Sequence, residues 1–221
     1  MKGIYNSILF FLFAANVLQA QQIKPPFWDD IQKFKKQDSI NMPAKNKILF
    51  VGSSTFTKWT DVQSYFPSYP ILNRGFGGSS LTDVIRYSDE VIFNYQPKQI
   101  IIYCGDNDFA ANDSVTVDTV VSRFKQLFAI IRNHYKKISV AYISIKPSPS
   151  RQRLVPKFEE ANNQVKKYLH KKRKAVFIDV FHAMLNTDST PIKEIFTEDN
   201  LHMNAKGYAI WQKIIEPYLL K

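Results

Sequence analysis

The protein has 221 residues, of which 45% are hydrophobic and 22% are charged, and its formal net charge is +11. This composition excludes an intrinsically disordered chain, and the length suits a single α/β domain with a substantial core. Part of the positive charge comes from a run of cations between Lys166 and Lys174, which we interpret as a solvated helix end; because no nucleic-acid module accompanies it, we expect no nucleic-acid partner.

The first twenty residues have the order of a secretory signal peptide. Lys2 supplies a positive start, residues 8–18 are almost uninterruptedly apolar, and Ala20 is a small residue suited to cleavage. The apolar run is short for a membrane span, and an uncleaved N-terminal anchor is the alternative. We therefore expect residues 1–20 to be a signal peptide and the mature protein to be periplasmic or secreted, with no stable membrane span.

The rest of the chain divides into an N-terminal helical extension and linker, residues 21–46, and one domain, residues 47–221. In the domain, apolar segments of strand length alternate with segments of helical periodicity. Strands are expected at 47–51, 71–73, 99–104, 138–145 and 175–180, and helices at 29–37, 81–95, 117–134, 156–172 and 205–219. The pattern predicts an α/β fold, a three-layer α/β/α sandwich with a five-stranded parallel sheet, flavodoxin-like in form. Functional residues are then expected in loops after the strands.

Cys104 is the single cysteine of the chain, so an intramolecular disulfide is excluded. It ends an apolar run and is most simply a buried small residue. A catalytic thiol is the other interpretation, but no histidine stands out as its partner.

The segments after the first two predicted strands are rich in serine and glycine. Ser53 and Ser54 follow the first strand, where a hydroxyl can point into a cleft or cap a helix. Residues 73–80 follow the second strand and hold three glycines in four positions, which lets the backbone approach a ligand or forms a tight turn. A dinucleotide-binding loop is rejected, because its third glycine and its ribose-binding acid are both missing.

Two further segments carry polar side chains near the expected edge of the sheet. Residues 105–108, Gly-Asp-Asn-Asp, follow the third strand, where the Asn107 amide can donate into the cleft or the segment can form a turn. Asp199 and His202 precede the last helix at a spacing at which a turn brings a carboxylate to the histidine that it orients. Among the other histidines, His182 has Asp179 nearby and is the alternative that stays open.

Taken together, these segments resemble the motif blocks of the SGNH hydrolase superfamily, the GDSL-type lipases, acylhydrolases and esterases. The blocks occur in the family order over essentially the whole chain after the signal segment. The resemblance implies that Ser54 is the nucleophile, that His202 is its base, and that Asp199 orients His202. It also implies an oxyanion hole formed by the backbone N–H groups of Ser54 and Gly78 and by the Asn107 side chain.

The first block departs from the family pattern, because Ser53 stands where the family usually has aspartate. Neither the implied triad nor the implied oxyanion hole uses that aspartate. The choice of Ser54 over Ser53 therefore rests on its place in the block.

The resemblance implies a serine ester hydrolase that acts on a small-molecule, glycan or lipid ester, with no metal and no cofactor. No long apolar lid is evident, which favours short acyl groups, and we expect residues 146–156 and 181–198 to shape the pocket. The first alternative is a non-catalytic carbohydrate- or lipid-binding protein on the same fold. The second is a phosphodiesterase or nuclease, for which the sequence offers no metal-ligand set.

Overall fold

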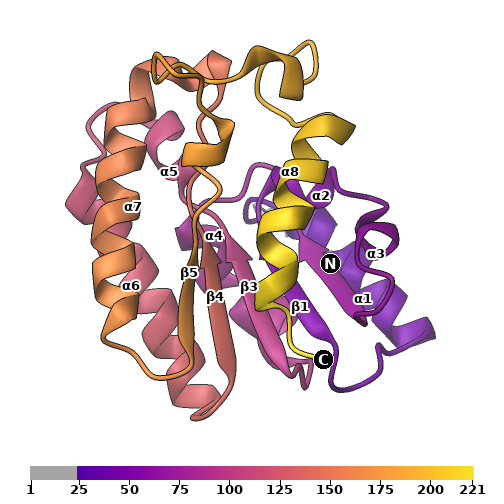
Figure 1. Ribbon diagram of the computed structural model, residues 1–221. Coiled ribbons are helices and arrows are strands. Elements are labelled where there is room, and N and C mark those ends of the chain that lie inside the picture. The colour runs from indigo at the N-terminus through magenta and orange to yellow at the C-terminus, as the bar shows by residue number, and fades with distance from the viewer. Residues whose placement is uncertain (1–23) are drawn as a thin grey trace, which may run out of the picture.

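The computed structural model describes residues 24–221, so the expected signal peptide lies outside the described residues. Five strands form one parallel sheet in the order β2-β1-β3-β4-β5 (Figure 1). The strands are β1 (Ile48–Gly52), β2 (Ile71–Gly75), β3 (Gln99–Tyr103), β4 (Ser139–Ile143) and β5 (Ala175–Ile178). The predicted five-stranded parallel α/β sandwich is confirmed.

Helices cover both faces of this sheet, with α6 and α7 on one side and α8 on the other (Figure 1). The α-helices are α1 (Trp28–Ile40), α2 (Ser54–Thr57), α3 (Val62–Tyr65), α4 (Leu81–Arg86), α5 (Asp106–Ala111), α6 (Val117–His134), α7 (Val155–His170) and α8 (Ala205–Ile215). A π-helical turn, η1 (Asp89–Phe93), and four 3₁₀ turns complete the chain: η2 (Pro149–Leu154), η3 (His182–Met184), η4 (Lys193–Ile195) and η5 (Glu216–Tyr218). None of the helices within residues 24–221 is long and apolar enough to cross a membrane.

Successive side chains of a strand point to opposite sides of the sheet, and helices cover both sides. The apolar strands are therefore buried on both faces. In β3, Ile100 and Ile102 join the core beneath α4, α6 and α7, whereas Ile101 and Tyr103 join the core beneath α2 and α8. The N-terminal extension belongs to the first of these cores, since Ile31 of α1 is buried in it.

Two expected helices are interrupted in the structure. The segment expected as one helix over 81–95 divides into α4, which begins with a Ser80–Asp83 capping box, and the π-helical turn η1. The last helix ends at Ile215, where Pro217 lies in the first turn of η5 and has no N–H to continue the α-helical pattern. The short helices α2 and α5 are too brief to give a periodic signal, and the sequence did not predict their extent.

Candidate active site

The carboxyl ends of all five strands meet at one edge of the sheet, the upper edge in Figure 1. At the end of β1 the chain passes close to β3 and enters α2 with Ser54 as its first residue. Gly52 makes this passage possible: its φ is 146°, and a Cβ there would lie 1.8 Å from the Tyr103 carbonyl oxygen. Ser54 is thereby held at the sheet edge, at the start of a helix.

Ser54, His202 and Asp199 form a continuous hydrogen-bonded chain, although Ser54 and His202 are 148 residues apart. The Ser54 Oγ lies 3.0 Å from His202 Nε2, and His202 Nδ1 lies 2.6 Å from Asp199 Oδ2. The His202 side chain is 21% exposed, so its ring is reachable from solvent but largely enclosed. The structure thus brings together the three side chains that the sequence analysis proposed as a triad.

The loop that carries Asp199 holds the carboxylate in place through donors of its own. Asp199 Oδ1 accepts hydrogen bonds from the N–H groups of Leu201 and His202, each at 2.9 Å, and from the Thr197 hydroxyl at 2.8 Å. Burial on its own would raise the pKa of Asp199, but the hydrogen bonds from His202, Leu201 and Thr197 outweigh it and hold the pKa below its usual range. Asp199 is therefore an anionic acceptor facing the imidazole.

A buried lysine after β4 also holds the loop that carries Asp199 and His202. Lys146 follows β4, is 1% exposed, and donates from Nζ to the Leu201 carbonyl oxygen at 2.8 Å. Burial lowers the pKa of Lys146 to about 8. A second bond, from the Ser150 N–H to the Asn200 carbonyl at 3.0 Å, ties the loop after β4 to the loop of Asp199 and His202.

The glycine-rich loop after β2 lies directly against Ser54, since a Cβ added to Gly77 would be 3.9 Å from the Ser54 Cβ. Gly78 has a φ of 86°, a conformation that favours glycine, and Phe27 of the N-terminal extension lies beside it. Within residues 24–221, the N–H groups of Ser54 and Gly78 donate to no protein acceptor. Both groups are therefore free to donate to a ligand.

Asn107 joins this cluster from the end of β3. Its Nδ2 donates to the Ser79 carbonyl at 3.0 Å, which uses one of the two hydrogens of the amide nitrogen. Its Oδ1 accepts from Arg151 Nη2 at 2.8 Å, while Arg151 Nη1 donates to Asp106 Oδ2 at 2.7 Å. The guanidinium thereby fixes the Asn107 amide with its NH₂ group towards the glycine loop.

The sequence alone did not point to Arg151 or Lys146 as site residues. Both lie in the segment after β4, which we expected only to line the pocket. Their position at the carboxyl end of a parallel strand was the available signal, because that edge carries the other site residues.

Two other residues considered in the sequence analysis lie apart from the triad. His182 forms the same short contact as His202, with Nδ1 2.8 Å from Asp179 Oδ2, but its side chain is 64% exposed and it makes no hydrogen bond to Ser54. Cys104 is fully buried and donates to the Ser79 carbonyl at 3.4 Å; burial raises the pKa of its thiol well above the usual value. A buried neutral thiol is a poor nucleophile.

Ser53 is also fully buried, and its hydroxyl has no hydrogen-bond partner within the described part of the chain.

The contacts of Asp108 are structural. Its carboxylate accepts hydrogen bonds from the Leu81 N–H and from Arg123, each at 2.8 Å, and so anchors the start of α4. Across residues 24–221, no group of three or more His, Cys, Asp or Glu side chains is arranged to hold a metal ion.

The model of the GDSL-like lipase/acylhydrolase family matches residues 51–210, so the chain belongs to that family. No curated protein matches the sequence significantly. Among solved structures, a GDSL-like lipase from Bacteroides thetaiotaomicron is similar, with a TM-score of 0.74 and 19% identity over 86% of this chain and 96% of that one.

Two structures of carbohydrate-active enzymes are similar in fold as well. A carbohydrate esterase family 3 protein from Talaromyces cellulolyticus has a TM-score of 0.63 and 16% identity over 78% of this chain and 95% of that one. A variant of an acetyl-xylooligosaccharide esterase from Geobacillus has a TM-score of 0.63 and 15% identity over 80% of this chain and 95% of that one. At these identities the similarity shows the shared fold.

Proposed function

We propose that this protein is a serine ester hydrolase that releases a short acyl group through an acyl-Ser54 intermediate. The observation that carries the proposal is the unbroken chain of hydrogen bonds from Asp199 through His202 to Ser54. A serine hydroxyl is a weak nucleophile on its own, and an adjacent imidazole held by a carboxylate is the arrangement that activates it. The non-catalytic alternative gives no reason for this alignment.

In the proposed reaction, Ser54 Oγ attacks the ester carbonyl carbon while His202 Nε2 takes the hydroxyl proton. The resulting imidazolium is stabilised by the Asp199 carboxylate, and it then returns the proton to the departing alcohol as the ester C–O bond breaks. Water repeats the sequence on the acyl-serine: His202 takes a proton from the water, the carboxylic acid leaves, and Ser54 recovers its proton.

The negative charge that develops on the carbonyl oxygen needs donors already in place. The free N–H groups of Ser54 and Gly78 and the second Nδ2 hydrogen of Asn107 are the proposed donors. Loss of one such donor commonly costs about a hundred- to a thousandfold in rate. Ser54 and Asn107 lie in the first turns of α2 and α5, and both contact the loop that carries Gly78, so the three proposed donors are held close together without substrate.

The preference for short acyl groups rests on two observations. Residues 24–221 form no long apolar lid over Ser54, and a hollow of about 510 Å³ beside the loop of Asp199 and His202 is lined mostly by polar residues, such as Lys193, Glu194 and Thr197. The similar fold of an acetyl-xylooligosaccharide esterase supports an acetylated sugar as one candidate substrate.

The test is a series of p-nitrophenyl esters from acetate to laurate, together with acetylated xylo-oligosaccharides, assayed with and without EDTA. We expect kcat/KM to be highest for the acetyl substrates and to be unchanged by EDTA, because the proposed donors are N–H groups. Ser54→Ala serves as the blank. A rate that rises with chain length, or one that EDTA abolishes and added metal restores, would reject this function.

Arg151 provides a separate prediction about the oxyanion hole. Arg151→Ala removes the bond that orients the Asn107 amide, so we expect kcat to fall by roughly ten- to a hundredfold with little change in KM. Arg151→Lys should not restore the rate, since one ammonium group cannot reproduce the two-pronged contact with Asp106 and Asn107. The matched control is Arg153→Ala, whose partner Asp113 is an exposed residue. Equal losses in the Arg151 and Arg153 variants would contradict the positioning role.

We also propose that the protein is exported, as the apolar run before Ala20 suggests. N-terminal sequencing of the protein from its native host should then find Gln21 at or near the start. A cytoplasmic protein that retains Met1 would refute export.

A further inference from the structure

The edge of the sheet opposite the candidate active site is strongly basic. In a parallel sheet every strand begins at this edge, so the segments that lead into the five strands gather there: residues 41–47, 66–70, 94–98, 135–138 and 171–174. None of the five segments contains an aspartate or a glutamate, and four of them contain lysine or arginine. We call the cations of these segments the basic edge.

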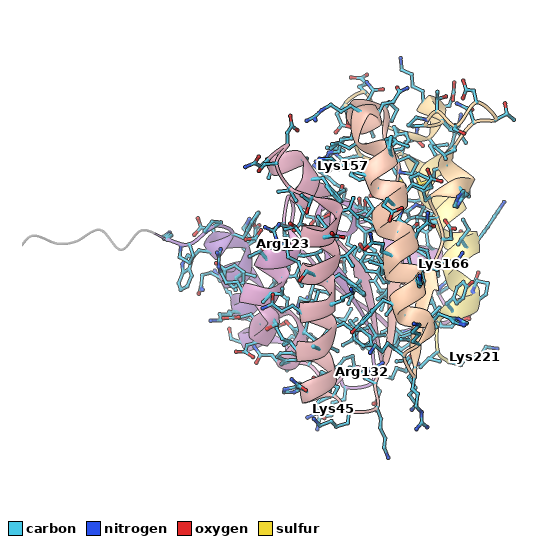
Figure 2. All side chains as sticks on the ribbon, turned by 90° about the vertical axis from the view of Figure 1, so that its left-hand side faces the viewer. Lys45, Arg123, Arg132, Lys157, Lys166 and Lys221 are labelled. Carbon is cyan, nitrogen blue, oxygen red and sulfur yellow. The ribbon has the colours of Figure 1, made fainter. Side chains whose placement is uncertain are left out.

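The basic edge is an ordered surface whose charges are uncompensated. Arg132 at the end of α6 donates to the carbonyl oxygens of Ile138, Arg173 and Lys174, which fixes the backbone of two of these segments, 135–138 and 171–174. Their side chains line a hollow of about 470 Å³. Within residues 24–221, no cation of the basic edge forms an ion pair with a carboxylate. Figure 2 shows Lys45 and Arg132 at this end of the molecule and Lys157 towards the other.

Exposed apolar side chains lie beside the same edge. Five large hydrophobic residues are exposed in the described part of the chain, and four of them lie at this edge: Ile40 and Met42 at the start of segment 41–47, and Tyr218 and Leu220 beside Gln99, the first residue of β3. Ile40 lines one hollow together with Lys47. Tyr218 and Leu220 are held at the start of β3 by the Gln99 side chain, at 2.7 and 2.9 Å. Apolar side chains are therefore interspersed with the lysines.

We propose that the basic edge and these four apolar residues form a docking surface for an anionic membrane. Cations near a bilayer are drawn to phosphate headgroups, and exposed apolar side chains gain free energy by entering the interface. A soluble polyanion would engage the cations but would give no role to Ile40, Met42, Tyr218 and Leu220. Docking by this edge turns the candidate active site away from the bilayer, so the substrate would be reached from the aqueous side.

The proposal is independent of the ester-hydrolase function, and binding is its readout. The protein is mixed with vesicles of phosphatidylcholine alone or with phosphatidylglycerol added, and bound protein is measured by co-sedimentation. We expect binding to the anionic vesicles that weakens as salt is raised. Any contribution from residues 1–23 is common to all variants, so the comparison between variants reports on the docking surface.

Two sets of variants locate the surface. The triple variant Lys136→Glu, Lys137→Glu, Arg173→Glu should bind anionic vesicles about tenfold or more weakly. The control Lys58→Glu, Lys193→Glu, Lys206→Glu makes the same change in net charge on exposed residues outside the docking surface and should bind nearly as well as the wild type. Equal losses in the two triple variants would show attraction by net charge alone and would overturn the proposal.

A third variant separates a membrane from a soluble polyanion. Met42→Ser with Leu220→Ser leaves the charge unchanged and should reduce vesicle binding severalfold, while binding to dextran sulfate stays unchanged. If the double variant binds vesicles as the wild type does, the apolar residues have no part in docking, and a soluble polyanion becomes the better-supported partner. Circular dichroism of each variant verifies that it is folded.

Discussion

Replacing Ser54 with alanine is expected to abolish ester hydrolysis while the fold remains intact. The hydroxyl is the only group of the proposed triad that bonds to the acyl carbon, and in serine hydrolases its loss reduces kcat on the order of a millionfold. Ser54 is the first residue of a short helix at the sheet edge, and within residues 24–221 its Oγ bonds only to His202. The measurement is p-nitrophenyl acetate turnover, with circular dichroism and thermal unfolding as folding controls.

Ser53→Ala is the matched control, because it removes the neighbouring hydroxyl of the same type. The Ser53 hydroxyl is fully buried and has no partner among residues 24–221, so its loss should leave hydrolysis within a fewfold of the wild type. An inactive Ser53→Ala protein beside an active Ser54→Ala protein would show that the nucleophile has been placed one residue too far along the chain.

The second large effect is expected for Asp199→Asn, which should leave the protein folded but reduce kcat by about ten-thousandfold. The amide cannot stabilise the imidazolium, and it favours the wrong tautomer of His202. Asp179→Asn is the natural control, since Asp179 makes the same contact with His182 at the same spacing. Steady-state kinetics of the two variants should differ by several orders of magnitude. Comparable losses would mean that the two Asp–His pairs had been assigned wrongly.

Because the pKa of Asp199 is lowered, the free energy of unfolding of the wild type and that of Asp199→Asn should depend differently on pH. A carboxyl group with a depressed pKa in the folded state stabilises the protein above its unfolded pKa, about 3.9, and loses that contribution as the pH falls through the folded value. The wild type should therefore lose free energy of unfolding relative to Asp199→Asn below about pH 4. Urea unfolding at pH 7 and pH 3 measures the difference, and a constant difference would contradict the pairing of Asp199.

Parallel strands were predictable because they are buried on both faces and appear as continuous apolar runs. Residues 99–104, for example, stand out plainly in the sequence, and β3 occupies nearly the same range. The interruption between α4 and η1 was not predictable, since the apolar periodicity continues through Val91 and Ile92, and both side chains are buried. Periodicity reports which residues are buried but not whether the backbone stays α-helical between them.

In the candidate site, too, the sequence predicted the local contacts but not the contacts between distant segments. An aspartate three residues before a histidine occurs twice, at Asp179 and at Asp199, and both pairs form the local contact. Only the second bonds to a serine, and that bond spans 148 residues, so spacing alone could not choose between them. Arg151 was missed for a related reason: its partners, Asp106 and Asn107, begin the helix after a different strand, β3, and become its neighbours only in the folded protein.

The most direct test of the central claim is covalent labelling with an alkyl fluorophosphonate followed by peptide mass spectrometry. This reagent phosphonylates a serine that a neighbouring base has activated, and fluoride leaves. We expect one adduct per chain, on Ser54, formed slowly or not at all in His202→Ala. No adduct on Ser54, an adduct on Ser53, or equally fast labelling without His202 would contradict it.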